Sequence, residues 1–291
     1  MRRFCRTLAV AVALLSLFSF ALSQGGAEPA AEPAAEPAEA TAEPSEPASE
    51  PAAAPPEGLA PARPASPEDM PTLPPMETVE PIPPGRLSGV KIGIDPGHQA
   101  RQNSSLEAIA PGSSQKKAKV SSGTSGSATG VAEHVVNLDV SLKLRDALEA
   151  LGCEVFLTRE TADVDISNQQ RAIMMNELGV DLVLRIHCNG SANAKANGIG
   201  LYIRKTGASE DECSRAAEAL LPAMLEATGA NEDGIFRRDT YTGLNWSEVP
   251  SILVEMGFMS NKEEDLKLND PAYQDKLVSG MVEGICAYMG R

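Results

Sequence analysis

The chain has 291 residues, an ordinary apolar fraction of 42% and a formal net charge of -15. This length and composition suit one sizeable hydrophobic core with accessory segments, so a single folded domain is the starting expectation. The acidic excess argues against nucleic acid as a partner, because phosphate backbones recruit basic surfaces.

The N-terminus has the order of a secretory signal peptide. Arg2, Arg3 and Arg6 precede an apolar run from Leu8 to Leu22, and small residues follow. Such a run falls short of the roughly 20 apolar residues that a membrane-spanning helix needs. Removal of residues 1–23 is therefore favoured over their retention as a membrane anchor. The mature protein is expected to be exported, without a membrane span, to the extracellular space, the cell wall or the periplasm.

Residues 24–87 form an Ala/Glu/Pro-rich segment with units such as Ala31-Glu32-Pro33-Ala34 and almost no large apolar side chains before Leu59. Such a composition cannot bury enough surface to offset the loss of chain entropy, so the segment is predicted to be a disordered, extended spacer. Much of the acidic charge lies here. A role as ligand for a proline-recognising partner is disfavoured, because no basic residue flanks a proline pair in the usual way.

The folded part is predicted to begin with a buried strand from Val90 to Ile94, which stops at a turn formed by Asp95-Pro96-Gly97. Residues 99–131 are then predicted to be a long polar loop rich in Ser and Gly, and loops of that length inside a domain are usually functional or mobile. Apolar spacing predicts a helix from Glu133 to Leu151, which Gly152 ends.

The remaining pattern alternates between strands and helices. Strands are predicted at 153–157, 182–186, 198–203 and 252–255, and helices at 167–178, 209–228 and 271–289. A βαβαβ alternation predicts one α/β domain, residues 88–291, with a mostly parallel central sheet flanked by helices. In such sheets, ligands bind beyond the carboxyl ends of the strands.

Polar residues of the right type for a metal site follow the ends of predicted strands. His98 comes after the first strand, His187 ends another, and Glu255 ends a late one. A catalytic zinc takes three protein ligands and leaves one position open. His98 and His187 would supply two, and Glu133 or its neighbour His134 the third, since adjacent helical positions point about 100° apart and cannot both reach one ion.

Each residue also has a structural explanation. A histidine at a strand end is commonly a hydrogen-bonded scaffold residue, and a glutamate at a helix start commonly interacts with the helix dipole. The ligand types alone would admit divalent ions other than zinc. Four cysteines follow the signal segment, at 153, 188, 213 and 286, and fit no CxxC pattern, so they are expected to be buried apolar residues rather than a disulfide framework.

Four segments resemble a known family in both sequence and order. They are Ile94-Asp95-Pro96-Gly97-His98, Gly130-Val131-Ala132-Glu133, Leu184-Arg185-Ile186-His187-Cys188-Asn189 and Leu253-Val254-Glu255-Met256-Gly257-Phe258-Met259-Ser260-Asn261. The resemblance is to the zinc-dependent N-acetylmuramoyl-L-alanine amidases, the amidase type 3 family, and it runs across essentially the whole folded part. A lone Pro-Gly-His would be weak, whereas four motifs in order are specific.

The resemblance implies that His98, Glu133 and His187 bind Zn²⁺ and that Glu255 is the catalytic carboxylate. It also implies a substrate, peptidoglycan, in which the amide between the lactyl group of N-acetylmuramic acid and L-alanine is hydrolysed. A monomer is the favoured state. The chain departs from many relatives at Cys188, where they have a small residue. No functional change is expected, because alternation along a strand points Cys188 away from the face of His187.

Other polar and aromatic residues have open roles. Arg159 and Arg171 could hold substrate carboxylates or form structural ion pairs, and the structural role is favoured. Asn189 could orient the site through hydrogen bonds. Trp246 could pack beside the substrate or in the core. The 99–131 loop would flank the zinc, so it could contact substrate.

Three other functions compete with the amidase prediction. A different zinc amidohydrolase, such as a sugar deacetylase, could use the same metal and base. A non-catalytic binding domain on a spacer is disfavoured by Glu255, because a binder needs no general base. An enzyme that depends on a partner is a third alternative, although no segment is recognisable as an autoinhibitory helix.

Overall fold

The computed structural model describes residues 85–291 except 208. The predicted signal peptide and nearly all of the predicted linker lie outside the described residues. The folded part begins no later than Leu87, whose side chain is fully buried and whose backbone N–H donates to the carbonyl of Leu151 (2.9 Å). Within the described residues, no helix is both long enough and apolar enough to span a bilayer.

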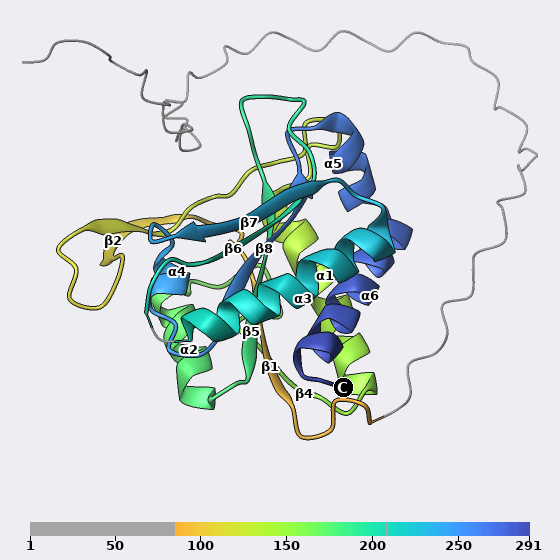
Figure 1. The fold of residues 1–291 in the computed structure, drawn as a ribbon. Coiled ribbons are helices and arrows are strands. Elements are labelled where there is room, and N and C mark those ends of the chain that lie inside the picture. The colour runs from red at the N-terminus through yellow and green to blue at the C-terminus, as the bar shows by residue number, and fades with distance from the viewer. Residues whose placement is uncertain (1–84, 208) are drawn as a thin grey trace, which may run out of the picture. The chain divides into compact units, whose positions relative to one another are not determined.

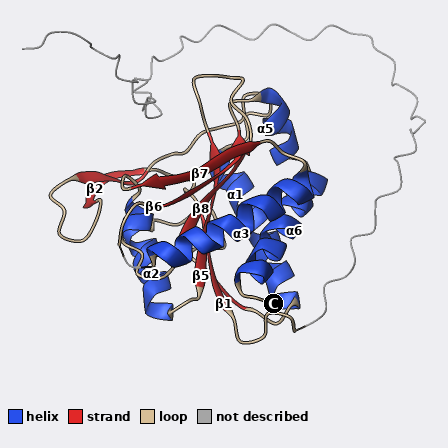
Figure 2. Ribbon diagram, in the orientation of Figure 1, coloured by secondary structure: helices blue, strands red, loops and turns tan. Residues whose placement is uncertain are grey.

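The described part contains both strands and helices (Figure 2). The strands are β1 Lys91–Pro96, β2 Asn103–Ala108, β3 Lys116–Val120, β4 Glu154–Leu157, β5 Leu182–Asn189, β6 Ile199–Arg204, β7 Glu232–Arg238 and β8 Ser251–Phe258. The helices are α1 Glu133–Ala150, α2 Asn168–Leu178, α3 Glu210–Thr228, α4 Thr242–Asn245, α5 Lys262–Leu268 and α6 Pro271–Tyr288.

The central sheet has six strands in the order β4-β1-β5-β8-β6-β7. Every neighbouring pair is parallel except β6 with β8, which is antiparallel, so β6 and β7 run opposite to the other four strands. The predicted α/β fold with a mostly parallel sheet and flanking helices is therefore confirmed, with a reversed pair at one edge. The carboxyl ends of β1, β5 and β8 meet at the same edge of the sheet.

Helices cover both faces of this sheet (Figure 1). On one face, α1, α3 and α6 pack on apolar residues of the central strands to form the main core, and α3 lies along α6. On the other face, Met175 of α2 packs with Val180 and Val183 in a smaller cluster. The two faces are thus unequal, and the face opposite the main core has room for polar side chains.

Local sequence signals explain the sharp ends of α2. The Ser167 hydroxyl accepts from the N–H of Gln170, and the Gln170 side chain accepts from the N–H of Ser167, which makes a capping box. At the other end, Gly179 has φ 59°, the left-handed conformation that stops helices. Both features agree with the predicted bounds.

The predicted long loop is wrong in part, because β2 and β3 form a two-stranded antiparallel hairpin inside residues 99–131. Its side chains, including Leu106, are largely exposed. An exposed strand needs no alternation of apolar and polar residues, so the sequence pattern does not predict it. The hairpin is held next to its turn, where the indole N–H of Trp246 donates to the carbonyl of Ala108, the last residue of β2 (2.8 Å). Tertiary contacts of this kind are not readable from a sequence pattern.

Three further elements, β7, α4 and α5, had no counterpart in the sequence prediction. Strand β7 carries the mixed sequence EDGIFRR and has no buried position along its length, and α4 is a single turn. Helix α5 is seven residues long and mostly charged. Short or exposed elements give weak periodicity, so they form here because neighbouring strands and helices pair with them.

Candidate active site

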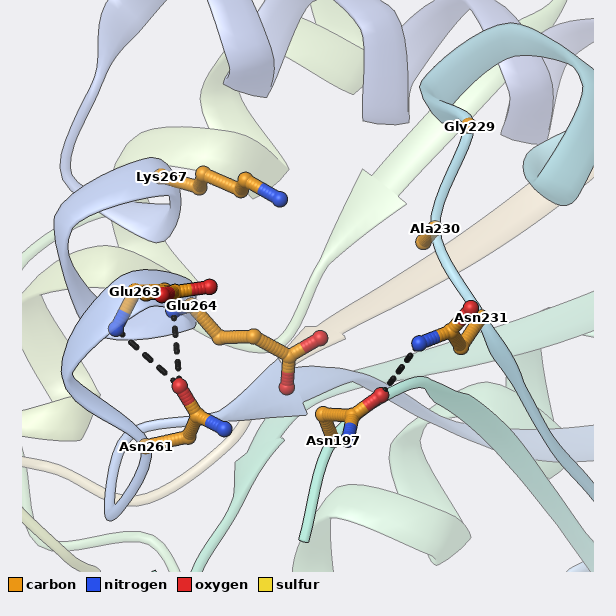
Figure 3. Close-up of a pocket in the computed structure, with 8 residues that line it drawn as sticks. All are labelled: Asn197, Gly229, Ala230, Asn231, Asn261, Glu263, Glu264 and Lys267. Carbon is orange, nitrogen blue, oxygen red and sulfur yellow. Dashed lines mark hydrogen bonds between the residues drawn. The ribbon is translucent and has the colours of Figure 1, made fainter. Parts of the chain in front are cut away.

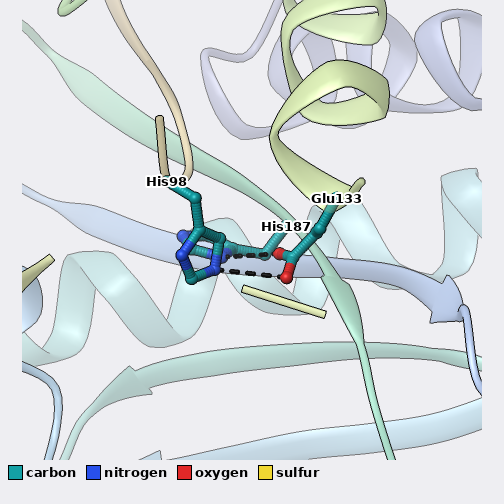
Figure 4. A group of neighbouring side chains, drawn as sticks. All are labelled: His98, Glu133 and His187. Carbon is teal, nitrogen blue, oxygen red and sulfur yellow. Dashed lines mark hydrogen bonds and ion pairs between the residues drawn. The ribbon is translucent and has the colours of Figure 1, made fainter. Parts of the chain in front are cut away.

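Three of the predicted residues come together near the carboxyl ends of β1 and β5 (Figure 4). His98 lies two residues after β1, Glu133 is the first residue of α1, and His187 lies on β5. One ligand atom from each can be chosen so that all three lie within 4.8 Å of one another. The sheet and one helix start therefore place two imidazoles and a carboxylate around a common point.

Backbone and amide donors hold the Glu133 carboxylate in place. Its Oε2 accepts from the N–H of Thr124 (2.9 Å), and its Oε1 accepts from the N–H of Cys188 (3.1 Å). The buried side chain of Asn137, one turn further along α1, donates to Oε1 (3.1 Å) and also to the carbonyl of Gly97 (3.3 Å). The carboxylate is thus fixed from three sides, with only 3% of its side chain exposed.

The two histidines face this carboxylate. Nε2 of His98 lies 3.2 Å from Oε2 of Glu133, and Nδ1 of His187 lies 3.1 Å from Oε1. The other ring nitrogen of His98, Nδ1, is 2.9 Å from the carbonyl of Ser121. A proton on Nδ1, donated to that carbonyl, leaves Nε2 free to accept a metal ion, the arrangement typical of metal-binding histidines.

The backbone around the histidines lets the side chains of the cluster pack closely against it. His98 itself has φ 57°, a conformation that non-glycine residues rarely adopt and that is concentrated at functional sites. A β-carbon at Gly97 would lie 2.3 Å from the ring of His187, so only glycine fits there. At Gly123, which has φ 79°, a β-carbon would lie 2.8 Å from Oε2 of Glu133. These glycines let the ring and the carboxylate sit against backbone.

The charges of these three side chains shift one another's pKa values. Burial would raise the pKa of Glu133, but the nearby His98 and hydrogen bonds from both histidines hold it well below its usual value. For His98, burial acts to lower the pKa, and the Glu133 carboxylate outweighs it and raises the pKa. Burial dominates at His187 and lowers its pKa. The cluster therefore favours an ionised carboxylate and one neutral imidazole, which are the ligand forms of both groups.

This set of donors fits a zinc ion. Two imidazole nitrogens and one carboxylate oxygen match a three-ligand catalytic zinc site with an open position. Ligand atoms about 2.0 to 2.1 Å from a tetrahedral ion are roughly 3.3 Å apart. Nε2 of His98 and Nδ1 of His187 lie 3.2 and 3.1 Å from different oxygens of Glu133, and single ligand atoms of the three residues lie within 4.8 Å of one another, so small side-chain adjustments would bring them to that spacing. His98 and His187 remain 14% and 15% exposed, so the point between them can be reached from solvent.

Glu255 lies one strand away from His187, its register partner in the pairing of β5 with β8. It is 8% exposed, and its Oε2 atom is buried without a hydrogen-bond partner among the described residues. Burial, followed by the negative charges of Glu133 and Asp233, raises its pKa well above the usual value. A carboxyl group with a raised pKa can both take and give a proton near neutral pH.

Other residues singled out in the sequence have internal partners. Arg171 pairs with Asp95 (2.8 Å), and Arg159 donates to the carbonyls of Pro96 (2.9 Å), Gly97 (2.9 Å) and His134 (2.9 Å). These contacts favour the structural role of both arginines. The side chain of His134 does not join the cluster formed by Glu133.

Cys188 points into the main core on the face opposite His187, and burial raises the pKa of its thiol well above the usual value. The four cysteines of the described part are buried and unpaired, as expected. The contact from Trp246 to Ala108, next to the hairpin turn, gives that side chain a structural role.

Two supporting residues were missed from the sequence. Asn137 is four positions after Glu133 and so lies on the same face of α1, a spacing that could have suggested it. The second is Asp265, whose fully buried carboxylate accepts from the N–H groups of Ala128 (2.7 Å) and Thr129 (2.8 Å). It ties the segment before Glu133 to α5, and no local pattern indicates so distant a contact.

A separate polar pocket lies beside α5 and does not include the cluster (Figure 3). It is lined by Asn197, Gly229, Ala230, Asn231, Asn261, Glu263, Glu264 and Lys267. Asn261 caps α5, and Glu264 accepts from the N–H groups of Gly198 (2.9 Å) and Phe258 (2.7 Å). These bonds join loops to the helix, so the pocket is a structural junction.

Several proteins with similar sequences and structures are named as amidases. A profile of the N-acetylmuramoyl-L-alanine amidase family matches residues 92–287. An N-acetylmuramoyl-L-alanine amidase of Mycobacterium tuberculosis is 29% identical over 218 residues, covering 71% of this chain and 89% of its own. The germination-specific N-acetylmuramoyl-L-alanine amidase of Bacillus subtilis is 28% identical over 221 residues, covering 69% and 81%. Among solved structures, the N-acetylmuramyl-L-alanine amidase Ami1 from Mycobacterium smegmatis aligns with a TM-score of 0.65 at 25% identity, covering 70% of this chain and 98% of its own.

Proposed function

The chain belongs to the N-acetylmuramoyl-L-alanine amidase family, and from that premise we propose that it is a zinc-dependent hydrolase of peptidoglycan. The bond cut is the amide between the lactyl group of N-acetylmuramic acid and L-alanine. The observation that carries the proposal is the convergence of His98, Glu133 and His187, with the unpartnered carboxyl group of Glu255 on the neighbouring strand.

His98, Glu133 and His187 would hold the zinc ion. When bound, zinc supplies Lewis-acid chemistry, because it lowers the pKa of a coordinated water to roughly 7 and polarises the amide carbonyl. The chain contributes the fixed geometry. The donors from Thr124, Cys188 and Asn137 leave the Glu133 carboxylate no freedom to swing away, as expected of residues that support a ligand.

Glu255 would move the proton. As general base it takes a proton from the attacking water, and as general acid it delivers that proton to the leaving amine of L-alanine. A pKa above the usual carboxyl range favours a group that takes a proton and later returns it, and burial raises the pKa of Glu255. Oε2 of Glu255 has no hydrogen-bond partner among the described residues, so it is free to accept the proton.

The cellular setting is proposed from the sequence together with the substrate. Residues 1–23 would direct export, residues 24–87 would act as a spacer, and residues 88–291 would form the catalytic domain, with a monomer favoured. Peptidoglycan lies outside the cytoplasmic membrane, so export to the cell wall, the periplasm or the extracellular space would bring enzyme and substrate together.

The direct test is digestion of purified peptidoglycan by the purified protein, with zinc and after removal of metal by a chelator. New L-alanine amino termini that appear only with zinc are the expected result. Release of acetate instead would favour a deacetylase. Binding without any released ends would favour a non-catalytic binding protein, and activity that appears only with a cell extract would favour dependence on a partner.

A further inference from the structure

Asp233 lies next to Glu255 on the same face of the sheet, at a break in strand pairing. The register of β6 with β7 skips one residue of β7, Asp233, just before Gly200 pairs with Gly234. A bulge of this kind redirects the side chain of its extra residue. Here the carboxylate lies over Gly200, because a β-carbon at that glycine would be only 2.8 Å from Oδ2 of Asp233.

Gly200 connects the two carboxylates, because it is the register partner of Glu255 in the antiparallel pairing of β6 with β8. Directly opposed residues of antiparallel strands project to the same face. The atom that Gly200 lacks would stand beside the side chain of Glu255, and the carboxylate of Asp233 takes that space instead. Gly200 therefore places no side chain between Asp233 and Glu255.

Neither carboxylate has a donor of its own. Oε2 of Glu255 is buried without a partner, and Glu255 is 8% exposed. Among the described residues, the Asp233 carboxylate receives no hydrogen bond or ion pair, and burial alone raises its pKa. Glu255 is buried and Asp233 partly so. Two neighbouring acceptors in such a setting repel one another unless an N–H donor or a cation comes between them. The pair is thus complementary to an amine.

We propose that Asp233 is a second substrate-contacting carboxylate, which with Glu255 receives the leaving amine of L-alanine. This inference rests on the proposed amidase function. Glu255 delivers the proton that it removed from water to the amide nitrogen after the water has attacked, and the four-bonded nitrogen then carries a positive charge and donates a hydrogen bond to Asp233. The C–N bond breaks with its electron pair passing to nitrogen, which leaves as a neutral amine. Because the substrate amide carries no such charge, Asp233 stabilises the transition state more than the bound substrate.

The first test compares D233N with D239N on a soluble muropeptide. Asp239 is an exposed aspartate close by on the same segment, which makes it a matched control. We expect D233N to lower kcat by about 10- to 100-fold with KM nearly unchanged, the size of a lost charge-assisted hydrogen bond. Zinc content and the thermal unfolding midpoint should match wild type. Equal kcat values for D233N and D239N would overturn the inference. An inactive wild-type protein would instead overturn the proposed function itself.

The second test needs no change at Asp233 and uses the product. Binding of a peptide that begins with a free L-alanine amine is compared with binding of its N-acetylated form, by calorimetry on the zinc-loaded wild-type protein. The free amine is expected to bind at least 10-fold more tightly. G200A, which places a methyl group where the Asp233 carboxylate lies, should reduce that preference. Equal binding of the two peptides to wild-type protein would show that no acceptor pair receives the amine.

Discussion

Two charged clusters lie on the same face of the central sheet, two residues apart along β5, which corresponds to about 7 Å. In the inner cluster, Asp95 pairs with Arg171 (2.8 Å) and with Arg185 (2.8 Å), and all three side chains are almost fully buried. The outer cluster is that of Glu133, with His187 following Arg185 on β5. The first cluster is closed to solvent, whereas the second is reached from it.

The clusters differ in whether their charges are satisfied from within the protein. The hydroxyl of Thr158 also donates to Asp95, and Glu107 of the hairpin faces Arg185 with a further negative charge. The outer cluster instead contains the unpartnered Oε2 of Glu255 and two partly exposed imidazoles. Burial of charge alone therefore does not mark a functional site. The outer cluster differs because it contains an acceptor without a partner among the described residues and imidazoles that a ligand can reach from solvent.

The largest effect is expected from E255Q, which should lower activity and leave stability nearly unchanged. A glutamine keeps the shape of Glu255 but can neither take nor deliver a proton, so amidase activity should fall by about 10²- to 10⁴-fold. Zinc content and unfolding free energy should stay near wild type, measured by metal analysis and urea denaturation. The exposed Glu232 on β7 offers a matched control, E232Q. Wild-type activity in E255Q would remove Glu255 from the mechanism.

The opposite pattern is expected from D95N. Loss of the central negative charge leaves Arg171 and Arg185 buried without their shared partner, which should cost about 3 to 5 kcal/mol of unfolding free energy. D163N, which breaks the exposed Arg101–Asp163 pair, should change stability little. Urea denaturation of both variants makes the comparison. A small effect in D95N would mean that the inner cluster is not what stabilises this face of the sheet.

A smaller effect is expected from N137A. Asn137 lies on α1 and donates a hydrogen bond to Glu133 of the outer cluster. Removal of the amide takes one donor from Glu133, and loss of such a supporting contact lowers metal affinity by about 10- to 100-fold. Competition with a zinc-binding dye measures it. S141A is the control, since Ser141 is equally buried on the same helix but donates to a backbone carbonyl and not to the carboxylate. Equal zinc affinity in both variants would count against zinc binding by Glu133.

The smallest effect is a dependence of stability on acid pH. Arg185, Arg171 and Thr158 together outweigh burial and hold the pKa of Asp95 well below its usual range. A lowered pKa contributes stability that is present above the unfolded value, about 3.9, and that is lost as pH falls through the folded value. The unfolding free energy of wild type should therefore decline below about pH 4, and D95N should decline less. Parallel curves would exclude Asp95 as the titrating group.

The order of the main strands and helices, apart from the β2–β3 hairpin, β7, α4 and α5, and the residue types of the candidate site could be predicted from the sequence. Caps such as Ser167 and Gly179 and the apolar runs of β1, β5 and β8 are local features, so they could be predicted one by one. The parallel alternation then places strand ends at one edge, which is why His98 and His187 could be expected near each other. The resemblance to a family supplied the choice of Glu133 over His134, which spacing had left open.

The tertiary structure decided everything that depends on contacts between distant segments. The hairpin at residues 99–131 forms without an apolar pattern, because Trp246 and Glu107 anchor it to other elements. The pairing of β6 against β8 reverses the sheet edge and brings Asp233 to Glu255. A sequence specifies which groups are available, through local propensity and period. Only packing determines which of them lose water and which are left without a partner, and that difference separates the structural cluster from the candidate active site.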